Sequence, residues 1–163
     1  VSGLVLHLSS TIWMVILMIR VFKESGRLKG AGAWHLVSSY LWIIAPIGMA
    51  PFILLGLVEG APIEQTAPQA LIYGWVLQFG IALIPHIARK YFLKEENPKL
   101  GGNWVSLAGA TLGSIFVWAS IFIVPARGVL YGIGFALYAI ALIYPVKELF
   151  EITRDGFKKI ESA

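Results

Sequence analysis

Apolar residues of this 163-residue chain gather in five long runs that are separated by shorter polar segments. Each run holds about 20 residues or more, which is the length a helix needs to cross the ~30 Å hydrocarbon core of a bilayer. The pattern therefore predicts an all-α protein, a polytopic membrane bundle of five transmembrane helices. The predicted helices cover residues 3–22, 33–58, 68–89, 104–124 and 129–150.

The third run is the centre of this pattern. Residues 67–91 read APQALIYGWVLQFGIALIPHIARKY, and a stretch of about twenty of them carries no charge. At helical spacing Gly74, Gln78 and Pro85 fall near one face. A small residue and an amide on the same face are typical of a helix that packs closely against its neighbours and hydrogen-bonds to them.

The polar segments between the runs predict connectors. Residues 59–69 carry Glu59 and Glu64 and are expected to form a solvated outer loop. Within the second run, Pro46 and Pro51 should each kink the helix, because proline removes a backbone donor and clashes with the preceding turn.

The end of the chain has a different pattern, in which charged residues alternate with Ile152, Phe157 and Ile160. This alternation predicts an interfacial cytoplasmic tail over residues 151–163 that lies along the headgroups. Residues 1–150 are expected to form a single transmembrane helix bundle.

Positive charge is distributed unevenly around the five runs. All but one of the 13 Lys and Arg residues fall on one side, which the positive-inside rule assigns to the cytoplasm. The N-terminus is therefore expected outside and the C-terminus in the cytoplasm. The basic residues on the predicted cytoplasmic side are Arg20, Lys23, Arg27, Lys29, Arg89, Lys90, Lys94, Lys99, Lys147, Arg154, Lys158 and Lys159, and Arg127 stands alone on the other side.

Composition supports a membrane protein. The chain is 58% hydrophobic and only 13% charged, whereas about a quarter of the residues of soluble domains are charged. Its net charge of +4 is explained by topology, since the basic residues flank apolar runs, and we expect no nucleic-acid partner. The chain has no cysteine, which excludes disulfides, thiolate metal sites and iron–sulfur clusters formed by this chain.

The chain begins with Val1 rather than Met. We expect either that a leader was removed or that this sequence starts inside a longer one. The first apolar run is too long for a signal peptide and lacks its small-residue cleavage pattern, so we interpret it as a spanning helix.

The three histidines are the side chains best suited to bind haem iron. His35 lies near the cytoplasmic start of the second helix and His86 near the cytoplasmic end of the third. Antiparallel neighbours would place them at a similar depth, as paired haem ligation requires. His7 lies at the opposite leaflet. The alternatives are a quinone or proton role, or interfacial histidines that bond to backbone carbonyls or water.

Polar groups on the third helix form a second candidate site. Gln69, Tyr73 and Gln78 could line a polar path or bind a quinone headgroup, or they could simply hydrogen-bond between helices. No Ser/His/Asp set, phosphate loop or metalloprotease motif is present, so we expect no catalytic residue and no metal site in this chain. No ionisable side chain is expected at mid-membrane, which disfavours an ion pump.

Two short motifs match the close-packing pattern of membrane helices, in which small residues stand four apart. They are Gly109 with Gly113 and Gly128 with Gly132. The pattern allows packing within the chain or a dimer face.

Helix three and its flanks resemble a segment of haem–copper oxidase subunit I, in the branch that contains nitric oxide reductases. There a His-x-His pair precedes a Gly-Trp, and the helix closes near a proline. The counterparts here are Ala67-Pro68-Gln69, then Gly74-Trp75, then Pro85. The resemblance implies that the five helices are similar to the last five of that family's bundle, in a prokaryotic inner membrane.

The departure from the family lies at its haem ligands. Ala67 and Gln69 stand where the paired histidines would stand, so no ligand carries over to either position. His35 and His86 lie toward the leaflet opposite to the family's haems. The resemblance therefore implies a subunit that keeps the scaffold, has lost that haem site, and supports a partner or binds quinone or a differently placed haem.

These observations lead to one main functional hypothesis and two alternatives. The chain is expected to be a membrane subunit of a prokaryotic respiratory or electron-transfer complex, which anchors partner subunits and contacts haem b or quinone. The first alternative is a transporter or channel subunit, which the proline-broken second helix favours. The second is a small enzyme acting on a lipid or isoprenoid, for which the sequence offers no catalytic set.

Overall fold

A computed structural model of the chain describes residues 2–161. Every regular element in that range is helical, and five helical segments are long and apolar enough to cross a membrane, as predicted. The elements are α1 (Ser2–Glu24), η1 (Arg27–Lys29), α2 (Ala31–Gly48), α3 (Ala50–Leu54), α4 (Gly60–Ala70), the π-helical segment η2 (Leu71–Val76), α5 (Leu77–Ala88), the π-helical segment η3 (Arg89–Leu93), α6 (Trp104–Phe122), η4 (Val124–Ala126) and α7 (Arg127–Glu161).

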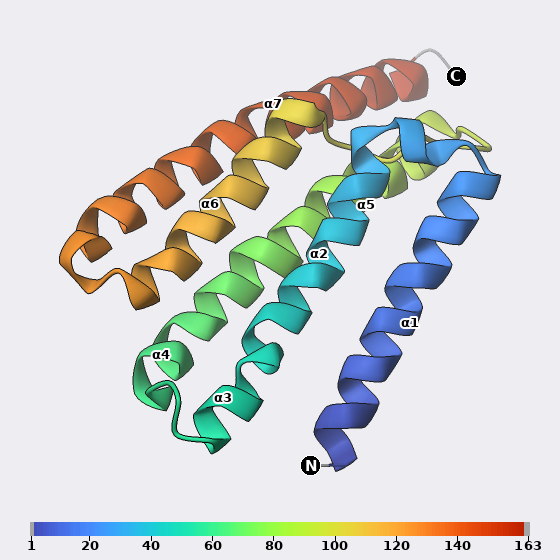
Figure 1. The fold of residues 1–163 in the computed structure, drawn as a ribbon. Helices are drawn as coiled ribbons and strands as arrows, with labels where there is room; N and C mark the ends of the chain where they lie inside the picture. The colour runs from blue at the N-terminus through green and yellow to red at the C-terminus, as the bar shows by residue number, and fades with distance from the viewer. Residues whose placement is uncertain (1, 162–163) are drawn as a thin grey trace.

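The helices form an antiparallel bundle in which α6 and α7 make a long hairpin, α2 and α5 pack in the middle, and α1 lies at the edge beside α2 (Figure 1). In an 18-residue apolar stretch of α6, 44% is buried inside the structure, whereas in the corresponding stretch of α1 the buried share is 6%. α1 begins at one end of the bundle and α7 ends at the opposite end, as an odd number of antiparallel long helices requires.

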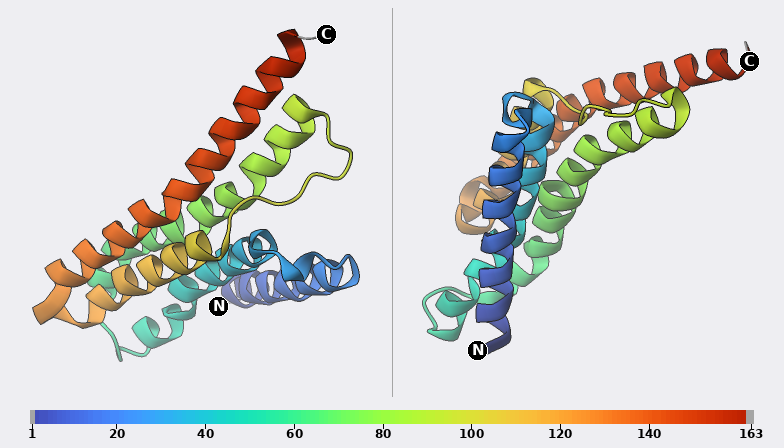
Figure 2. Two further views of the ribbon diagram at one scale, coloured as in Figure 1. Left: turned by 90° about the horizontal axis from the view of Figure 1, so that it is seen from above. Right: turned by 90° about the vertical axis from the view of Figure 1, so that its right-hand side faces the viewer.

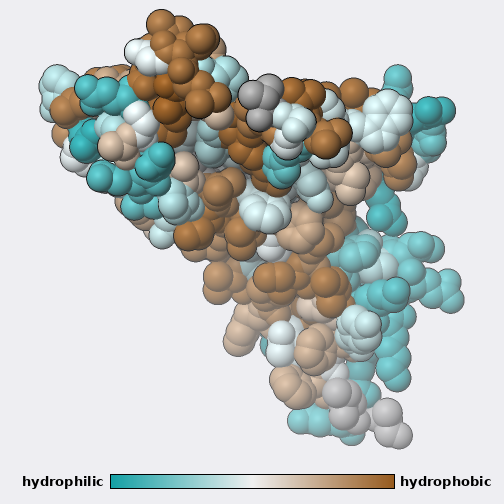
Figure 3. All heavy atoms as spheres, turned by 90° about the horizontal axis from the view of Figure 1, so that it is seen from below, coloured by the Kyte–Doolittle hydropathy of each residue, from teal (hydrophilic) through white to brown (hydrophobic). Residues whose placement is uncertain are grey.

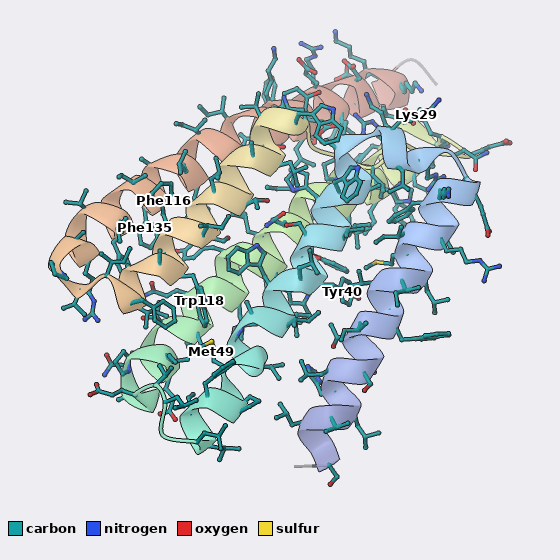
Figure 4. All side chains as sticks on the ribbon, viewed as in Figure 1. Lys29, Tyr40, Met49, Phe116, Trp118 and Phe135 are labelled. Atoms are coloured by element: carbon teal, nitrogen blue, oxygen red, sulfur yellow. The ribbon has the colours of Figure 1, made fainter. Side chains whose placement is uncertain are left out.

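The second span is broken where the prolines predicted it. Pro46 lies inside α2, which ends at Gly48, and Pro51 stands in the first turn of α3. Proline is tolerated in a first turn because its missing N–H has no helical partner there. Met49, labelled in Figure 4, marks the break. The helix was expected to continue to residue 58 but ends at Leu54, before a turn at Gly56 with a φ of 68°.

The connector predicted over residues 59–69 is wrong, because α4 occupies it. Glu59 is the N-cap residue of α4, Glu64 is an exposed helical residue, and Ile63 and Thr66 are buried. The third span therefore runs over 34 residues, Gly60–Leu93. The prolines in this stretch read as loop signals, but Pro62 lies in the first turn, where it does not interrupt a helical hydrogen bond.

The last helix does not end at residue 150. α7 continues to Glu161 and projects beyond the bundle beside η3 (Figure 2). Gly156 lies against Phe92, where an added Cβ would stand 2.8 Å from the Phe92 Cβ. The predicted tail is thus a helical extension as far as residue 161, and residues 162–163 lie outside the described residues.

Apolar residues cover the middle of the surface in the view of Figure 3, and hydrophilic residues gather toward its left and right sides. Many large side chains on it are more than half exposed, among them Leu6, Trp13, Ile143 and Val146. Such a surface is compatible with contact with lipid, since the hydrocarbon chains of a bilayer are as apolar as leucine.

Candidate functional site

Segment 94–103 packs back onto the end of the bundle where α2 begins and α5 ends. The Gly101 N–H donates to the Ala82 carbonyl at 2.9 Å, which ties the segment to α5. A Cβ at Gly101 would lie 2.4 Å from Pro85 Cγ and 2.5 Å from the Ile81 carbonyl oxygen. Only glycine fits this close approach, and the next residue, Gly102, also needs glycine because its φ is 84°.

A buried ion pair holds this segment to α7. Arg89 Nη2 donates to Glu148 Oε1 at 2.7 Å, and the two side chains are 9% and 6% exposed. The second carboxylate oxygen accepts from the Gly102 N–H at 3.0 Å, and Arg89 Nη1 donates to the Lys99 carbonyl at 3.5 Å. Because both carboxylate oxygens are hydrogen-bonded, the charge is buried with the partners it requires.

His35 also packs on Gly102 and is fully buried. A Cβ at Gly102 would stand 2.7 Å from His35 Cδ2, so the ring packs directly on the glycine. His35 Nε2 is 2.9 Å from Ser106 Oγ. Ser106 also forms the capping box of α6 with Asn103, through bonds of 2.8 and 2.9 Å. The start of α6 is therefore fixed against α2 by one histidine.

Gln78 completes the buried cluster. It has no exposed surface, and its amide lies close enough to interact with the His35 ring. His35 Nδ1 and both polar atoms of Gln78 nevertheless lack a hydrogen-bond partner of good geometry among the described residues. This cluster therefore has hydrogen-bonding capacity that the described residues do not use. Leaving a buried polar group unpaired costs about 1–3 kcal/mol.

His86 and His7 occupy different environments. His86 is half-buried near the end of α5, and its Nδ1–H donates to the Pro98 carbonyl at 2.9 Å. His35 and His86 therefore lie at the same end of the bundle, as predicted, but each contacts the 98–106 stretch of chain. His7 is exposed on α1, and its ring has no hydrogen-bond partner among residues 2–161.

The geometry does not fit a haem held between His35 and His86. An axial histidine needs a free ring nitrogen and room for the porphyrin beside it. His35 Nε2 faces Ser106 and Gly102, where an added Cβ would already lie 2.9 Å away. His86 donates its Nδ1–H to the Pro98 carbonyl and keeps Nε2 without a partner among the described residues, so the misfit lies at His35. Among the described residues there is also no group of three His, Cys, Asp or Glu side chains able to hold a metal ion.

Gln69 and Tyr73 lie on the same continuous helix as Gln78 but in different surroundings. Tyr73 stacks on Tyr138 with ring centroids 4.6 Å apart, and Tyr138 donates to Ser114 Oγ at 3.0 Å. Gln69 Oε1 is buried and has no partner in the part of the chain that the structure describes. The structure therefore associates Tyr73 with α7 and Gln78 with His35.

Both Gln69 and Tyr73 lie at or next to the π-helical segment η2. Gly74 in this segment packs against Trp42 so closely that an added Cβ would lie 2.4 Å from Trp42 Cγ. π-helical turns inside α-helices are frequent at functional sites. Here the turn accompanies the closest approach of the third span to α2.

Sequence reasoning missed Glu148 and gave Arg89 only a role in topology. A signal was present, because Glu148 falls on a stripe of buried positions along α7. The stripe advances by three or four residues, as one face of a helix does. Its members are Gly134, Tyr138, Ala141, Pro145, Glu148, Ile152 and Gly156. A carboxylate on such a stripe indicates a buried partner of opposite charge.

Comparison of the chain with protein-family models, with curated proteins and with solved structures found no match. The resemblance to the haem–copper oxidase scaffold thus depends on the residues quoted for it.

Proposed function

We propose that this chain is an integral membrane subunit of a prokaryotic respiratory or electron-transfer complex in the inner membrane, and that its own role is to anchor partner subunits. The observation that carries this proposal is the exposure of α1. This helix is long and apolar, yet only 6% of its 18-residue apolar stretch is buried by its own chain. Its main contacts are with α2 and η1, which leaves most of its circumference open.

The polar residues of α1 support a protein partner over lipid alone. His7 and Ser9 are exposed on this helix, and the His7 ring has no partner among the described residues. Polar groups that face hydrocarbon are unfavourable, and a neighbouring helix can satisfy them. The electron-transfer part of the proposal is supported by the family resemblance, with the redox group placed in a partner subunit because His35 is closed off by Ser106 and Gly102.

Site-specific photocross-linking in native membranes tests the anchoring role. A benzoylphenylalanine at Trp13, which is 63% exposed on α1, should give a cross-linked protein adduct, and the partner should copurify in mild detergent. The matched control places the same group at Ile143 of α7, which is 67% exposed. A yield of adducts at Trp13 no higher than at Ile143, together with no copurifying subunit, would overturn the anchoring role.

The purified complex also decides the cofactor question. Our proposal predicts that a Soret band, if the complex has one, belongs to a partner and persists when His35 or His86 is replaced. Quinone is detected separately, by extraction and chromatography. A Soret band that is lost in either histidine variant would place haem b in this chain.

One observation favours a second function, transport. The second span is broken between Gly48 and Ala50, and discontinuous helices often frame substrate sites in transporters. Uptake of a solute by vesicles that contain the purified chain alone would support this function. Inactive vesicles that hold correctly folded protein would argue against it.

A further inference from the structure

We propose that the chain carries a specific binding site for one anionic phospholipid at the end of the bundle where α2 begins. The headgroup would sit in a polar cavity between Arg27 and Lys99, and an acyl chain would follow an apolar groove between α2 and α6. This proposal is independent of the anchoring role.

The headgroup cavity is formed by η1, the first turn of α2 and the 97–102 stretch. Its volume is about 370 Å³. Arg27 and Lys99 both line it, and neither side chain makes an ion pair or a side-chain hydrogen bond with another residue in 2–161. The acidic residues of the same segment, Glu95 and Glu96, do not line it. The cavity therefore has two uncompensated positive charges, which complement an anionic headgroup.

The apolar groove has a volume of about 510 Å³ and runs between α2 and α6. Its walls include Leu41 and Ala108, and the two hydroxyls that reach it, Ser38 and Thr111, lie 3.3 Å apart and bond to each other. The two hydroxyls in the groove thus satisfy each other's hydrogen bonding. The groove therefore suits a hydrocarbon chain.

Tryptophans stand at the start of the groove on both helices. Trp34 and Trp104 both line it, and tryptophan is enriched at the headgroup level of membrane proteins. Trp34 Nε1 donates to the Leu28 carbonyl at 3.0 Å, which fixes that ring beside η1. The groove therefore begins where headgroups are expected.

Residues that lie close together in the chain line the cavity and the groove on both segments. On α2, Ala33 lines the cavity and Trp34 the groove. On the other side, Gly102 lines the cavity and Trp104 the groove. Generic attraction of basic residues to an anionic membrane needs no such groove, whereas a bound phospholipid uses both parts.

Native mass spectrometry of the delipidated full chain in detergent tests the site. The probes are phosphatidylglycerol and phosphatidylcholine with the same palmitoyl and oleoyl chains. The wild type should retain one phosphatidylglycerol in preference to phosphatidylcholine. Since each basic residue near an anionic surface contributes about 1 kcal/mol, the double variant Arg27→Gln/Lys99→Gln should lose about tenfold or more in apparent affinity. Equal retention of the two lipids by the wild type would overturn the proposal, whatever the variants do.

The control variant Lys90→Gln/Lys158→Gln removes two exposed charges from the same predicted side of the membrane, outside the cavity. It should bind phosphatidylglycerol like the wild type, and an equal loss in both double variants would mean generic attraction. Ala108→Trp fills the groove and should weaken lipid binding while both cations remain. If inorganic phosphate at millimolar concentration displaces the lipid, the cavity is a free-phosphate site and the proposal fails.

Discussion

Glu148 is the residue that connects α7, the end of α5 and the 94–103 segment. Replacement by Gln keeps the size of the side chain but leaves the Arg89 guanidinium buried without a countercharge. Breaking a buried pair in this way destabilises proteins by about 3–5 kcal/mol. We expect Glu148→Gln to lower the unfolding free energy by about 3 kcal/mol, measured by denaturant titration in detergent micelles.

The neighbouring ion pair on α7 provides the control for this variant. Lys147 and Glu151 lie 3.9 Å apart with side chains 71% and 50% exposed, and exposed pairs contribute about 0–1 kcal/mol. Glu151→Gln should therefore change stability by less than about 1 kcal/mol. Equal effects of the two substitutions would show that Glu148 is not buried against Arg89.

Gly101 is the second residue on which this end of the bundle depends. Alanine at this position would place a Cβ 2.5 Å from the Ile81 carbonyl oxygen, and the backbone must move to relieve that contact. We expect Gly101→Ala to destabilise the fold by about 2 kcal/mol, in the range of overpacked cores. Gly132→Ala, which meets nothing within 4 Å inside α7, should be neutral or stabilise by up to about 1 kcal/mol. A neutral Gly101→Ala in the same unfolding assay would contradict the close approach.

The sequence shows little of this residue-scale site. His35, Gln78 and His86 are visible as polar residues in apolar runs, and their helical positions place them near one end. Their partners could not be predicted, because Arg89 and Glu148 are 59 positions apart in the chain and only the packed bundle brings them together. Ser106 reads as a common small polar residue until Asn103 and His35 are seen beside it.

At the scale of elements, α2 and η2 pack against each other, and Trp42 and Gly74 approach especially closely there. Gly74→Ala should destabilise the fold by about 1–3 kcal/mol because the indole occupies the space of the new Cβ. In Trp42→Ala that space is free, so the double variant should be less destabilised than the sum of the two single variants. A coupling of about 0.5–3 kcal/mol is typical of residues in contact. Strict additivity would mean that the two helices do not meet at this point.

The sequence predicted the existence of the five long helices better than it predicted their ends. Length and hydropathy determine a spanning helix, and each predicted run coincides with one of the five segments. The ends depend on local chemistry that those runs do not contain. Pro62 was read as a loop residue although a first turn accepts it, and residues 151–161 remain helical in α7 because Ile152 and Gly156 pack on the rest of the chain.

The glycine pairs on α6 and α7 differ in what they do. Gly109 and Gly113 pack against the α7 backbone, where added Cβ atoms would lie 3.0 Å from the Leu137 and Gly134 carbonyl oxygens. The packing of this first pair is within the chain, as one reading of the motif predicted. Gly128 and Gly132 meet nothing within 4 Å, so the same spacing has no packing role among the described residues there.

At the scale of the whole molecule, both proposed roles depend on how the chain is threaded through the membrane. The polar network, the headgroup cavity, His35 and His86 lie at the end that carries most of the basic residues. The positive-inside rule predicts that this end lies in the cytoplasm. If the orientation were reversed, the cavity would face the wrong leaflet for attraction by the anionic lipids of the cytoplasmic surface.

Labelling of single introduced cysteines in intact spheroplasts is the most direct test, since the 163 residues contain no cysteine that would react. With a membrane-impermeant maleimide, cysteines at Glu59 and Arg127 should be labelled from outside, whereas cysteines at Ser25, Glu96 and Arg154 should react only after the membrane is permeabilised. The opposite pattern would contradict the predicted orientation, and labelling that places Glu59 and Arg127 on different sides would contradict the five-helix topology.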